Sequence, residues 1–403
     1  MILTRARPGS RSAVASALAA SLLLYACATE TKITAPPASQ PPAPAPPAAP
    51  VPRPERPPLP PPPAARAAPL PLAPPIGFAA LEGWDREDHA AALDMFRASC
   101  GAAKDVAAHE VCLRARDLGP QDEVIARAFW ETNFRVQPVG GDRAPDEGLL
   151  TGYFSPEYAA RPTRQFPFTS AVRARPADLP AADVGAGGGT VPYRDRQAIE
   201  NSPADQPLAW MKPEDLFFLQ IQGSGVLDFP DGRRQRAVYA ANNGMSFVGI
   251  AAPMRAQGLL TDNNTSGEMI RAWLAQHRGP DADDVMRRNP RYIFFTLQPY
   301  DGREPSGAAG VTLTPGRALA VDPSKHDYGA LYWINGEAPA LNGAFPVYRR
   351  LAMALDTGSA IRGEVRADLY LGTGEDAGAE AGRVRHRLKL YRLVPVLETS
   401  AAP

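Results

Sequence analysis

Short extended runs, interrupted by glycine and proline, make up about the last hundred residues of the chain. Examples are residues 310–323, 330–335 and 389–395. Strands this short, recurring about every 8–12 residues, favour a barrel over a parallel α/β sheet, in which long helices alternate with the strands. The sequence therefore predicts a mainly β fold.

One of these runs carries an aspartate on the polar face of a strand. Asp368 lies in R-A-D-L-Y-L-G (366–372), where apolar residues occupy alternate positions. Because side chains alternate between the two faces of a strand, the carboxylate projects opposite the apolar residues. It is then either a solvated surface group or part of the floor of a groove. Glycines at 363 and 372 favour the groove, because they let a ligand approach closely.

Length and charge limit the classes of function. The 403 residues are enough for two domains. The 43 basic and 43 acidic residues cancel, and no basic stripe with interleaved aromatics occurs, so nucleic acid is not an expected partner. The five histidines are scattered singly and give no support for a metal site.

The N-terminus has the features of an export signal. Arginines precede the apolar run 14–26, which is too short to span a bilayer. The run ends in L-Y-A-C, and Cys27 there resembles the acylated cysteine of bacterial lipoproteins, so residues 1–26 are predicted to be a lipoprotein signal peptide. An ordinary signal peptide with a coincidental cysteine is the alternative. Ala28 favours the outer membrane, so we expect a periplasmic protein, lipid-anchored to the outer membrane of a Gram-negative bacterium.

Residues 27–76 are rich in proline and alanine. Such a segment has too little apolar surface to fold, and we expect a disordered tether with polyproline II character. At roughly 3.1 Å per residue it would reach on the order of 130 Å when fully extended.

Helical periodicity marks residues 77–135, which we expect to pack against the β fold. Cys100 and Cys112 lie in this region and are the only cysteines besides Cys27. In an oxidising, exported compartment an even pair at short separation predicts a disulfide, here between the first two helices.

Residues 214–227, E-D-L-F-F-L-Q-I-Q-G-S-G-V-L, are predicted to be a strand. In that register Gln220 and Gln222 share one face and run into Gly-Ser-Gly, which suggests a polar face turned toward a ligand. The run lacks the lysine and the following helix of a phosphate-binding loop.

Taken together, the motifs resemble the membrane-bound lytic murein transglycosylase A family over roughly residues 148–395. The motifs are T-G-Y-F-S-P, F-F-L-Q-I-Q-G-S-G, N-N-G, I-R-A-W-L, N-P-R-Y-I-F-F, L-T-P-G-R-A-L-A-V-D-P, D-T-G-S-A-I-R-G, R-A-D-L-Y-L-G-T-G and E-A-G. The C-terminal part also resembles the domain named for three aspartates, here Asp322, Asp356 and Asp368.

The resemblance implies a fold and a division of the chain. The expected fold is a double-psi β-barrel with an inserted smaller β-barrel, preceded by a few helices. The larger barrel would comprise residues 77–157 plus 301–397, and the substrate-binding insert residues 158–300. A groove between them would bind the glycan.

The resemblance also implies a reaction, that of a peptidoglycan lytic exotransglycosylase, which is a lyase. The β-1,4 bond between N-acetylmuramic acid and N-acetylglucosamine would break without water and leave a 1,6-anhydromuramic acid end. Asp368 is the implied catalytic residue, acting first as general acid and then as base, and no cofactor or metal is needed. The implied partners are peptidoglycan glycan strands, the membrane through the Cys27 lipid and other cell-wall enzymes.

Further residues are assigned to this site. Asp356 is expected to support Asp368 through its charge or through hydrogen bonds, the alternative being a turn residue. Gln222, Ser224 and Gly225 are expected to contact sugar. Tyr153 either stacks on a sugar or packs in the core.

Three departures from the family pattern occur. Ser155 replaces an acidic residue, L-D-T-G-S (355–359) replaces Q-D-T-G-G, and D-Y-G (327–329) replaces P-L-G. The fine contacts to substrate at Ser155, Leu355 and Ser359 are therefore open.

Two other functions stay open. A non-catalytic peptidoglycan-binding lipoprotein would use the same groove and tether. A hydrolytic muramidase would need a second carboxylate, for which the candidates are Glu157, Asp215 and Glu364.

Overall fold

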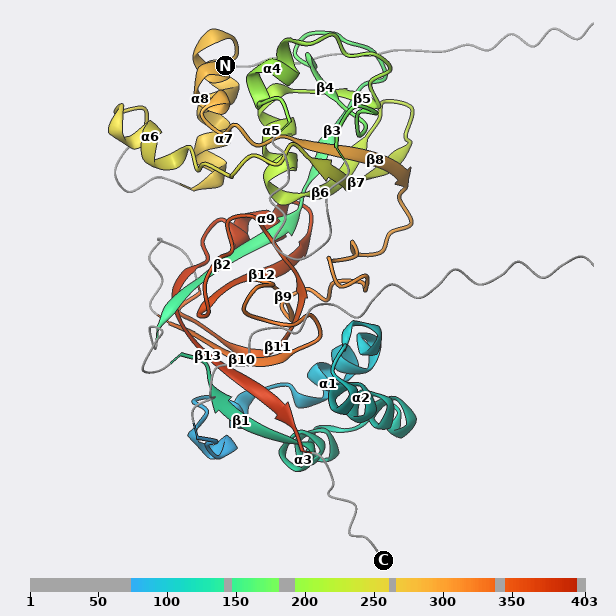
Figure 1. Cartoon of the computed structure of the whole chain (residues 1–403), viewed down its shortest axis with the longest axis vertical. Coiled ribbons are helices and arrows are strands. Elements are labelled where there is room, and N and C mark those ends of the chain that lie inside the picture. Colours follow the sequence, from blue (N-terminus) through green and yellow to red (C-terminus); the bar gives the residue numbers. More distant parts are fainter. Residues whose placement is uncertain (1–73, 141–146, 181–192, 261–265, 338–344, 397–403) are drawn as a thin grey trace, which may run out of the picture. The chain divides into compact units, whose positions relative to one another are not determined.

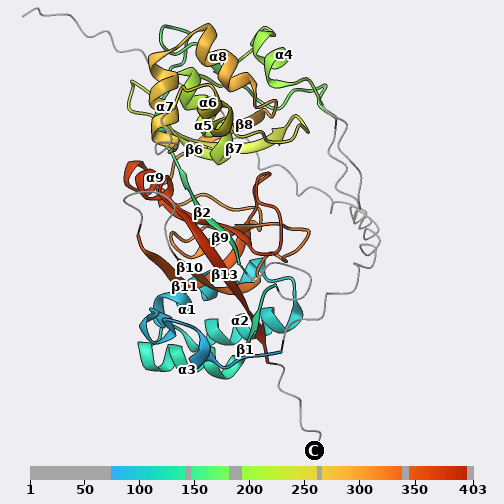
Figure 2. The same cartoon turned by 90° about the vertical axis from the view of Figure 1, so that its left-hand side faces the viewer.

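The structure is a computed structural model that describes residues 74–140, 147–180, 193–260, 266–337 and 345–396 (Figures 1 and 2). The predicted signal peptide, Cys27 and almost all of the predicted tether lie outside the described residues. Within the described ranges, no helix is long and apolar enough to cross a membrane.

The larger sheet closes on itself. Its strands are β1 (Phe134–Pro138), β2 (Gly148–Ser155), β9 (Ala318–Val321), β10 (Leu331–Glu337), β11 (Val347–Asp356), β12 (Arg366–Thr373) and β13 (Arg385–Pro395). The order is β1-β13-β10-β11-β9-β12-β2, and β2 also pairs with β13, which closes six of the seven strands into a barrel. The predicted mainly β fold with a barrel is confirmed. The double-psi crossing within it stays a prediction.

Three helices precede the barrel, as expected for residues 77–135. They are α1 (His89–Ala98), α2 (Val106–Leu118) and α3 (Glu123–Asn133). Each begins after an aspartate, at 88, 105 and 122, whose side chain accepts a hydrogen bond from the backbone of the first turn. Cys100, just after α1, is bonded to Cys112 of α2 with an S–S distance of 2.02 Å. Figure 1 shows these helices beside β1 and β13.

The segment between β2 and β9 forms a second, smaller β structure. Its strands are β3 (Glu157–Ala159), β4 (Ser170–Val172), β5 (Ala209–Met211), β6 (Ser224–Asp228), β7 (Arg234–Asn242) and β8 (Ile293–Pro299). Four of them form the sheet β3-β6-β7-β8, and β4 pairs with β5. Backbone hydrogen bonds join the two sheets at both ends, between Arg161 and Trp210 and from Phe295 N to Arg173 O. The strands therefore follow one another round a closed circuit.

Helices cover this smaller structure. They are α4 (Arg196–Asn201), α5 (Pro213–Gln222), α6 (Ala251–Ala256), α7 (Gly267–Gln276) and α8 (Pro280–Arg287), whereas α9 (Glu375–Ala381) follows β12 and packs on β12 and β2. In both views α5 to α8 lie with β6, β7 and β8 (Figures 1 and 2).

The prediction of one strand over residues 214–227 is wrong for its first part. Residues 213–222 are helix α5, and only Ser224–Asp228 form strand β6. Pro213 opens the helix, two acidic residues occupy its first turn, and Gly223 ends it with a positive φ of 84°. Leu216, Leu219 and Gln220 are buried at helical spacing. These start and stop signals outweigh the apparent alternation of the glutamines.

A glycine allows the first contact between β2 and β12. A Cβ on Gly148 would lie 1.6 Å from the carbonyl oxygen of Val365, so only glycine fits at this point. The two strands then run parallel, with Asp368 opposite Thr151 and Tyr370 opposite Tyr153. This pairing brings residues more than 200 positions apart in sequence into contact.

Candidate active site

Asp368 lies in the middle of β12. Its neighbours Ala367 and Leu369 are fully buried in a core that also contains Leu150 of β2. Asp368 projects from the other face, as the alternating pattern predicted, and is half-buried. It sits between Thr151 of β2 and Ala320 of β9.

A threonine and an arginine hold the Asp368 carboxylate. Thr151 Oγ1 donates a hydrogen bond to Asp368 Oδ1 at 2.5 Å. The same Oγ1 accepts a hydrogen bond from Arg366 Nη2 at 2.9 Å. The sequence offered no reason to assign a role to Thr151 or Arg366. Thr151 belongs to the T-G-Y motif and Arg366 to the R-A-D motif, but the motifs do not show that their two strands pair.

Opposing effects set the pKa of Asp368. Burial raises it, and the nearby charge of Asp356 raises it further, whereas Arg366 and the hydrogen bond from Thr151 lower it. Burial prevails, and the pKa lies above the usual range of an aspartate. A protonated carboxyl at this position is what a general acid requires.

Asp356, at the end of β11, is held by two donors. Tyr153 Oη donates to Oδ2 at 2.9 Å, and Ala308 N donates to Oδ1 at 3.0 Å. Burial raises the pKa of Asp356, although these hydrogen bonds oppose the shift. Asp356 also acts electrostatically on Asp368, and the supporting role expected for it stays a prediction.

Tyr153 lies beside Asp356 and Tyr370. Its ring packs against Tyr370 with centroids 5.2 Å apart, and its hydroxyl is committed to Asp356. Burial raises the pKa of the phenol, and the charges of Asp356 and Asp368 add to the shift. The side chain is half-buried, so a sugar contact through an exposed part of the ring stays a prediction.

Glu304 is a further acidic residue beside β12 that the sequence did not reveal. Its Oε2 accepts hydrogen bonds from Tyr370 Oη at 2.5 Å and from Thr373 Oγ1 at 2.7 Å. It lies in the irregular segment between β8 and β9, where no periodicity or motif points to it.

The expected sugar-contacting residues lie further along β2. Gln222 Oε1 accepts a hydrogen bond from Phe154 N at 3.2 Å. Phe154 is three residues beyond Thr151 on the same strand, about 10 Å at the usual rise per residue. Gly225 is buried, and a Cβ there would lie 2.8 Å from Pro156 O, so its close approach is to the protein itself. Ser224 is half-buried at the start of β6.

Asp322, which follows β9, lies in a turn and is held by several donors. Its carboxylate accepts hydrogen bonds from Ser324 N, Ser324 Oγ and Gly363 N at 3.0, 2.8 and 2.9 Å. Burial alone would raise its pKa, but these hydrogen bonds and Arg362 lower the pKa below its usual value. Such a carboxylate stays ionised and fixes the turn.

The other candidate carboxylates each pair with a cation. Glu157 lies 2.5 Å from Arg234, Asp215 lies 2.6 Å from Arg271, and Glu364 lies 3.7 Å from Lys325. The charged groups that act on Asp368 are Arg366 and Asp356, and these three carboxylates are not among them.

Two of the family departures are buried. Leu355 is fully buried in the core between the helices and the barrel, next to Asp356. Ser155 is also buried, and its hydroxyl has no hydrogen-bond partner in the part of the chain that the structure describes. Ser359 is half-buried.

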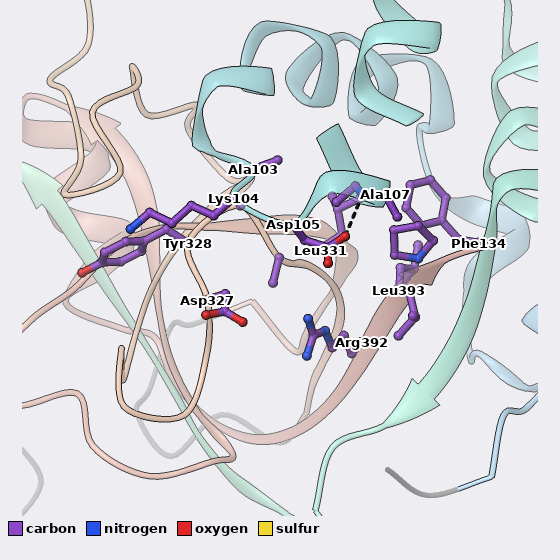
Figure 3. A pocket seen from close by; sticks show the side chains of 15 residues that line it. Ala103, Lys104, Asp105, Ala107, Phe134, Asp327, Tyr328, Leu331, Arg392 and Leu393 are labelled. Atoms are coloured by element: carbon purple, nitrogen blue, oxygen red, sulfur yellow. Dashed lines mark hydrogen bonds between the residues drawn. The ribbon is translucent and has the colours of Figure 1, made fainter. Parts of the chain in front are cut away.

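A separate hollow lies beside the start of α2. Its lining includes Lys104, Tyr328 and Arg392, and Asp105 within it caps the helix by accepting from Ala108 N at 2.8 Å (Figure 3). None of the predicted site residues lines it. Among the described residues, no group of three or more His, Cys, Asp or Glu side chains could hold a metal ion.

Two family models match this chain. The MltA specific insert domain matches residues 149–296, and the 3D domain matches residues 317–394. A membrane-bound lytic murein transglycosylase A of Vibrio cholerae is 30% identical over 268 residues, which cover 64% of this chain and 68% of the relative. The chain belongs to the membrane-bound lytic murein transglycosylase A family.

Other members of the transglycosylase family agree with this assignment. The Escherichia coli K12 relative is 32% identical over 260 residues, 62% of this chain and 66% of the relative, so the match spans just under two thirds of that protein. The crystal structure of a membrane-bound lytic murein transglycosylase from Agrobacterium tumefaciens is 30% identical with a TM-score of 0.66, covering 80% of this chain and 97% of that one. The E. coli MltA structure with bound chitohexaose is 25% identical with a TM-score of 0.60, covering 83% and 95%.

Proposed function

We propose that this chain is a lytic transglycosylase that cleaves the β-1,4 bond between N-acetylmuramic acid and N-acetylglucosamine in peptidoglycan. Its products would carry 1,6-anhydromuramic acid ends. The observation that carries the proposal is a half-buried Asp368 with a raised pKa, held by Thr151 in a chain of the transglycosylase family. The chitohexaose bound to the E. coli relative supports a glycan as the ligand of this site.

A single carboxyl group suffices for this reaction. Asp368 gives its proton to the leaving O4 of N-acetylglucosamine as the C1–O4 bond breaks. The muramyl O6 attacks C1 to form the anhydro ring, and its proton passes to the Asp368 carboxylate, which restores the acid. Intramolecular attack has a high effective molarity, so no second carboxylate has to activate water.

The other expected residues act around this step. Burial, with a smaller contribution from the charge of Asp356, favours the protonated form of Asp368, and Asp356 is itself oriented by Tyr153. Gln222 and Ser224, which are half-buried, would contact sugars further along the glycan, whereas Gly225 is buried against the protein. We further propose that residues 77–157 and 301–397 form the catalytic barrel domain, and that residues 158–300 form the substrate-binding insert.

The setting is part of the same proposal. Cys27 would carry the lipid that anchors the chain to the outer membrane, and residues 27–76 would let the enzyme reach the cell wall in the periplasm. Cell-wall enzymes are the protein partners that this location suggests.

Digestion of purified peptidoglycan by the full chain tests the proposal. We expect products one water lighter than hydrolytic products by mass spectrometry, formed about 10²–10⁴-fold more slowly by Asp368→Asn. Asp117→Asn, on the exposed side of α2, is the matched control and should act as the unmodified chain does. Products that contain the water would make the chain a muramidase, and binding to peptidoglycan without any product would make it a wall-binding lipoprotein.

A further inference from the structure

The two oxygens of Asp368 have different surroundings. Oδ1 accepts the hydrogen bond from Thr151 Oγ1, whereas Oδ2 has no hydrogen-bond partner among the described residues. Among the described residues, Oδ2 is not one of the buried polar atoms that lack a partner, so it is not sealed inside the protein. Asp368 as a whole is half-buried. Oδ2 is therefore the oxygen that remains available to a substrate.

Arg366 orients the threonine hydroxyl. A hydroxyl has one proton and two acceptor positions, and a guanidinium only donates. Because Arg366 Nη2 donates to Thr151 Oγ1 at 2.9 Å, one acceptor position is occupied and the hydroxyl proton is directed to Asp368 Oδ1. If the acidic proton of Asp368 were on Oδ1, it would compete with the Thr151 proton for this oxygen.

The arginine is itself fixed by the backbone. Arg366 Nη1 donates to the carbonyl oxygens of Ala367 at 2.5 Å and Leu149 at 3.3 Å. These carbonyls belong to β12 and β2, which pair in parallel register. The Arg366 side chain thus bridges the two strands. The chain of hydrogen bonds from Arg366 to Thr151 to Asp368 is therefore fixed by the pairing of β2 with β12.

We propose that Thr151 and Arg366 are positioning residues that keep Oδ1 of Asp368 occupied, so that Oδ2 carries the transferable proton. This inference rests on the proposed function. The proton leaves Oδ2 for the leaving oxygen, and the proton of the attacking hydroxyl returns to Oδ2. Thr151 keeps its own proton throughout.

Thr151 and Arg366 also limit the rise in the pKa of Asp368, which has to act first as an acid and then as a base. A residue that first donates and then accepts a proton needs a pKa near the working pH. Burial and Asp356 push the pKa of Asp368 upward, and Arg366 and Thr151 restrain it. Three charged or titratable groups surround Asp368: Arg366 on β12, Asp356 on β11 and Tyr153 on β2. Arg385 of β13 acts on Arg366, and the residue opposite Asp368 on β9 is the uncharged Ala320.

The test is the pH dependence of anhydro-product release from peptidoglycan by the full chain. Loss of the Asp368 proton makes the rate fall at high pH. Thr151→Val removes a hydrogen bond that favours the ionised form, so the descending limb should move to higher pH. The maximal rate should fall by up to about a hundredfold, because the acid is no longer held in position. Arg366→Gln should move the limb in the same direction. Thr151→Ser keeps the hydroxyl and should restore both the rate and the limb.

Thr132→Val, on the exposed side of α3, is the matched control and should change neither quantity. Circular dichroism of each variant identifies a folding defect, and if Thr151→Val does not fold, Arg366→Gln and Thr151→Ser decide the question. An unmoved limb in the folded variants, or a Thr151→Ser variant as impaired as Thr151→Val, would overturn the inference and leave the proposed function intact. An unmodified chain that releases no anhydro product would overturn both.

Discussion

The turn after β9 and the middle of β12 each hold an aspartate of the 3D domain, and the pKa values of the two carboxyl groups are shifted in opposite directions. Asp322 accepts three hydrogen bonds and has a lowered pKa. Asp368 accepts one and has a raised pKa. Burial opposes the ionised form in both. It prevails at Asp368, whereas the hydrogen bonds and Arg362 together prevail at Asp322.

The largest expected difference between the two residues is in activity. Asp368→Asn removes the proposed acid and should lower the rate of peptidoglycan cleavage by about 10²–10⁴-fold. Asp322→Asn keeps one of the two oxygen acceptors in the turn and leaves the proposed acid unchanged, so the folded fraction should retain activity. Initial rates per folded molecule measure both variants, and equal losses would show that Asp322 is more than a turn residue.

The turn should matter more for stability. Asp322→Ala leaves Gly363 N and Ser324 N without their acceptor, which should cost about 1–3 kcal/mol in the free energy of unfolding. Urea denaturation measures this cost. Asp301→Ala, at an exposed aspartate, is the control, and an unchanged midpoint for Asp322→Ala would refute the turn role.

Tyr153→Phe tests the donors of the third aspartate. It removes the hydroxyl that donates to Asp356 Oδ2 and should cost about 1 kcal/mol at neutral pH, where the ionised form needs that donor. The pKa of Asp356 should rise, because a hydrogen bond that favours the anion is lost. The cost should therefore shrink in acid when unfolding is followed as a function of pH, and a cost that does not change with pH would argue for a packing role of Tyr153 alone.

The smallest expected effect concerns the pH dependence of stability. Because the folded-state pKa of Asp368 is raised, its favourable contribution is present below the unfolded-state pKa and is lost as pH rises through the folded-state pKa. Asp368→Asn should therefore stabilise the fold at neutral pH by about 0.5 kcal/mol, since solvent screens a half-exposed group, and the gain should vanish in acid.

Asp322 should behave in the opposite sense. Its pKa is lowered, so its contribution is present above the unfolded-state pKa and is lost as pH falls through the folded-state value. Thermal unfolding of the unmodified chain, Asp368→Asn and Asp322→Asn over a series of pH values compares the two. A gain from Asp368→Asn that persists in acid would mean that ionisation of Asp368 is not its cause.

Local patterns predicted much of the fold and part of the site. The alternation in residues 366–372 predicted that Asp368 lies on one face of the strand and that Ala367 and Leu369 lie on the other. Both apolar residues are buried, as the pattern predicted. Apolar spacing predicted the N-terminal helices, and the spacing of Cys100 and Cys112 matched a disulfide. The error at residues 213–222 came from counting alternation over a short apolar run while Pro213 and Gly223 signalled a helix.

The sequence by itself determined which face of β12 carries Asp368, because side-chain direction within a strand depends only on the local period of two. The family motifs contained Thr151 and Arg366, but only the tertiary structure decided that they meet at Oδ1 of Asp368. That meeting depends on the parallel register of β2 with β12, strands more than 200 residues apart. The same holds for Glu304, which reaches Tyr370 from an irregular segment. Register across a closed barrel is set by the packing of all its strands, and no local pattern records it.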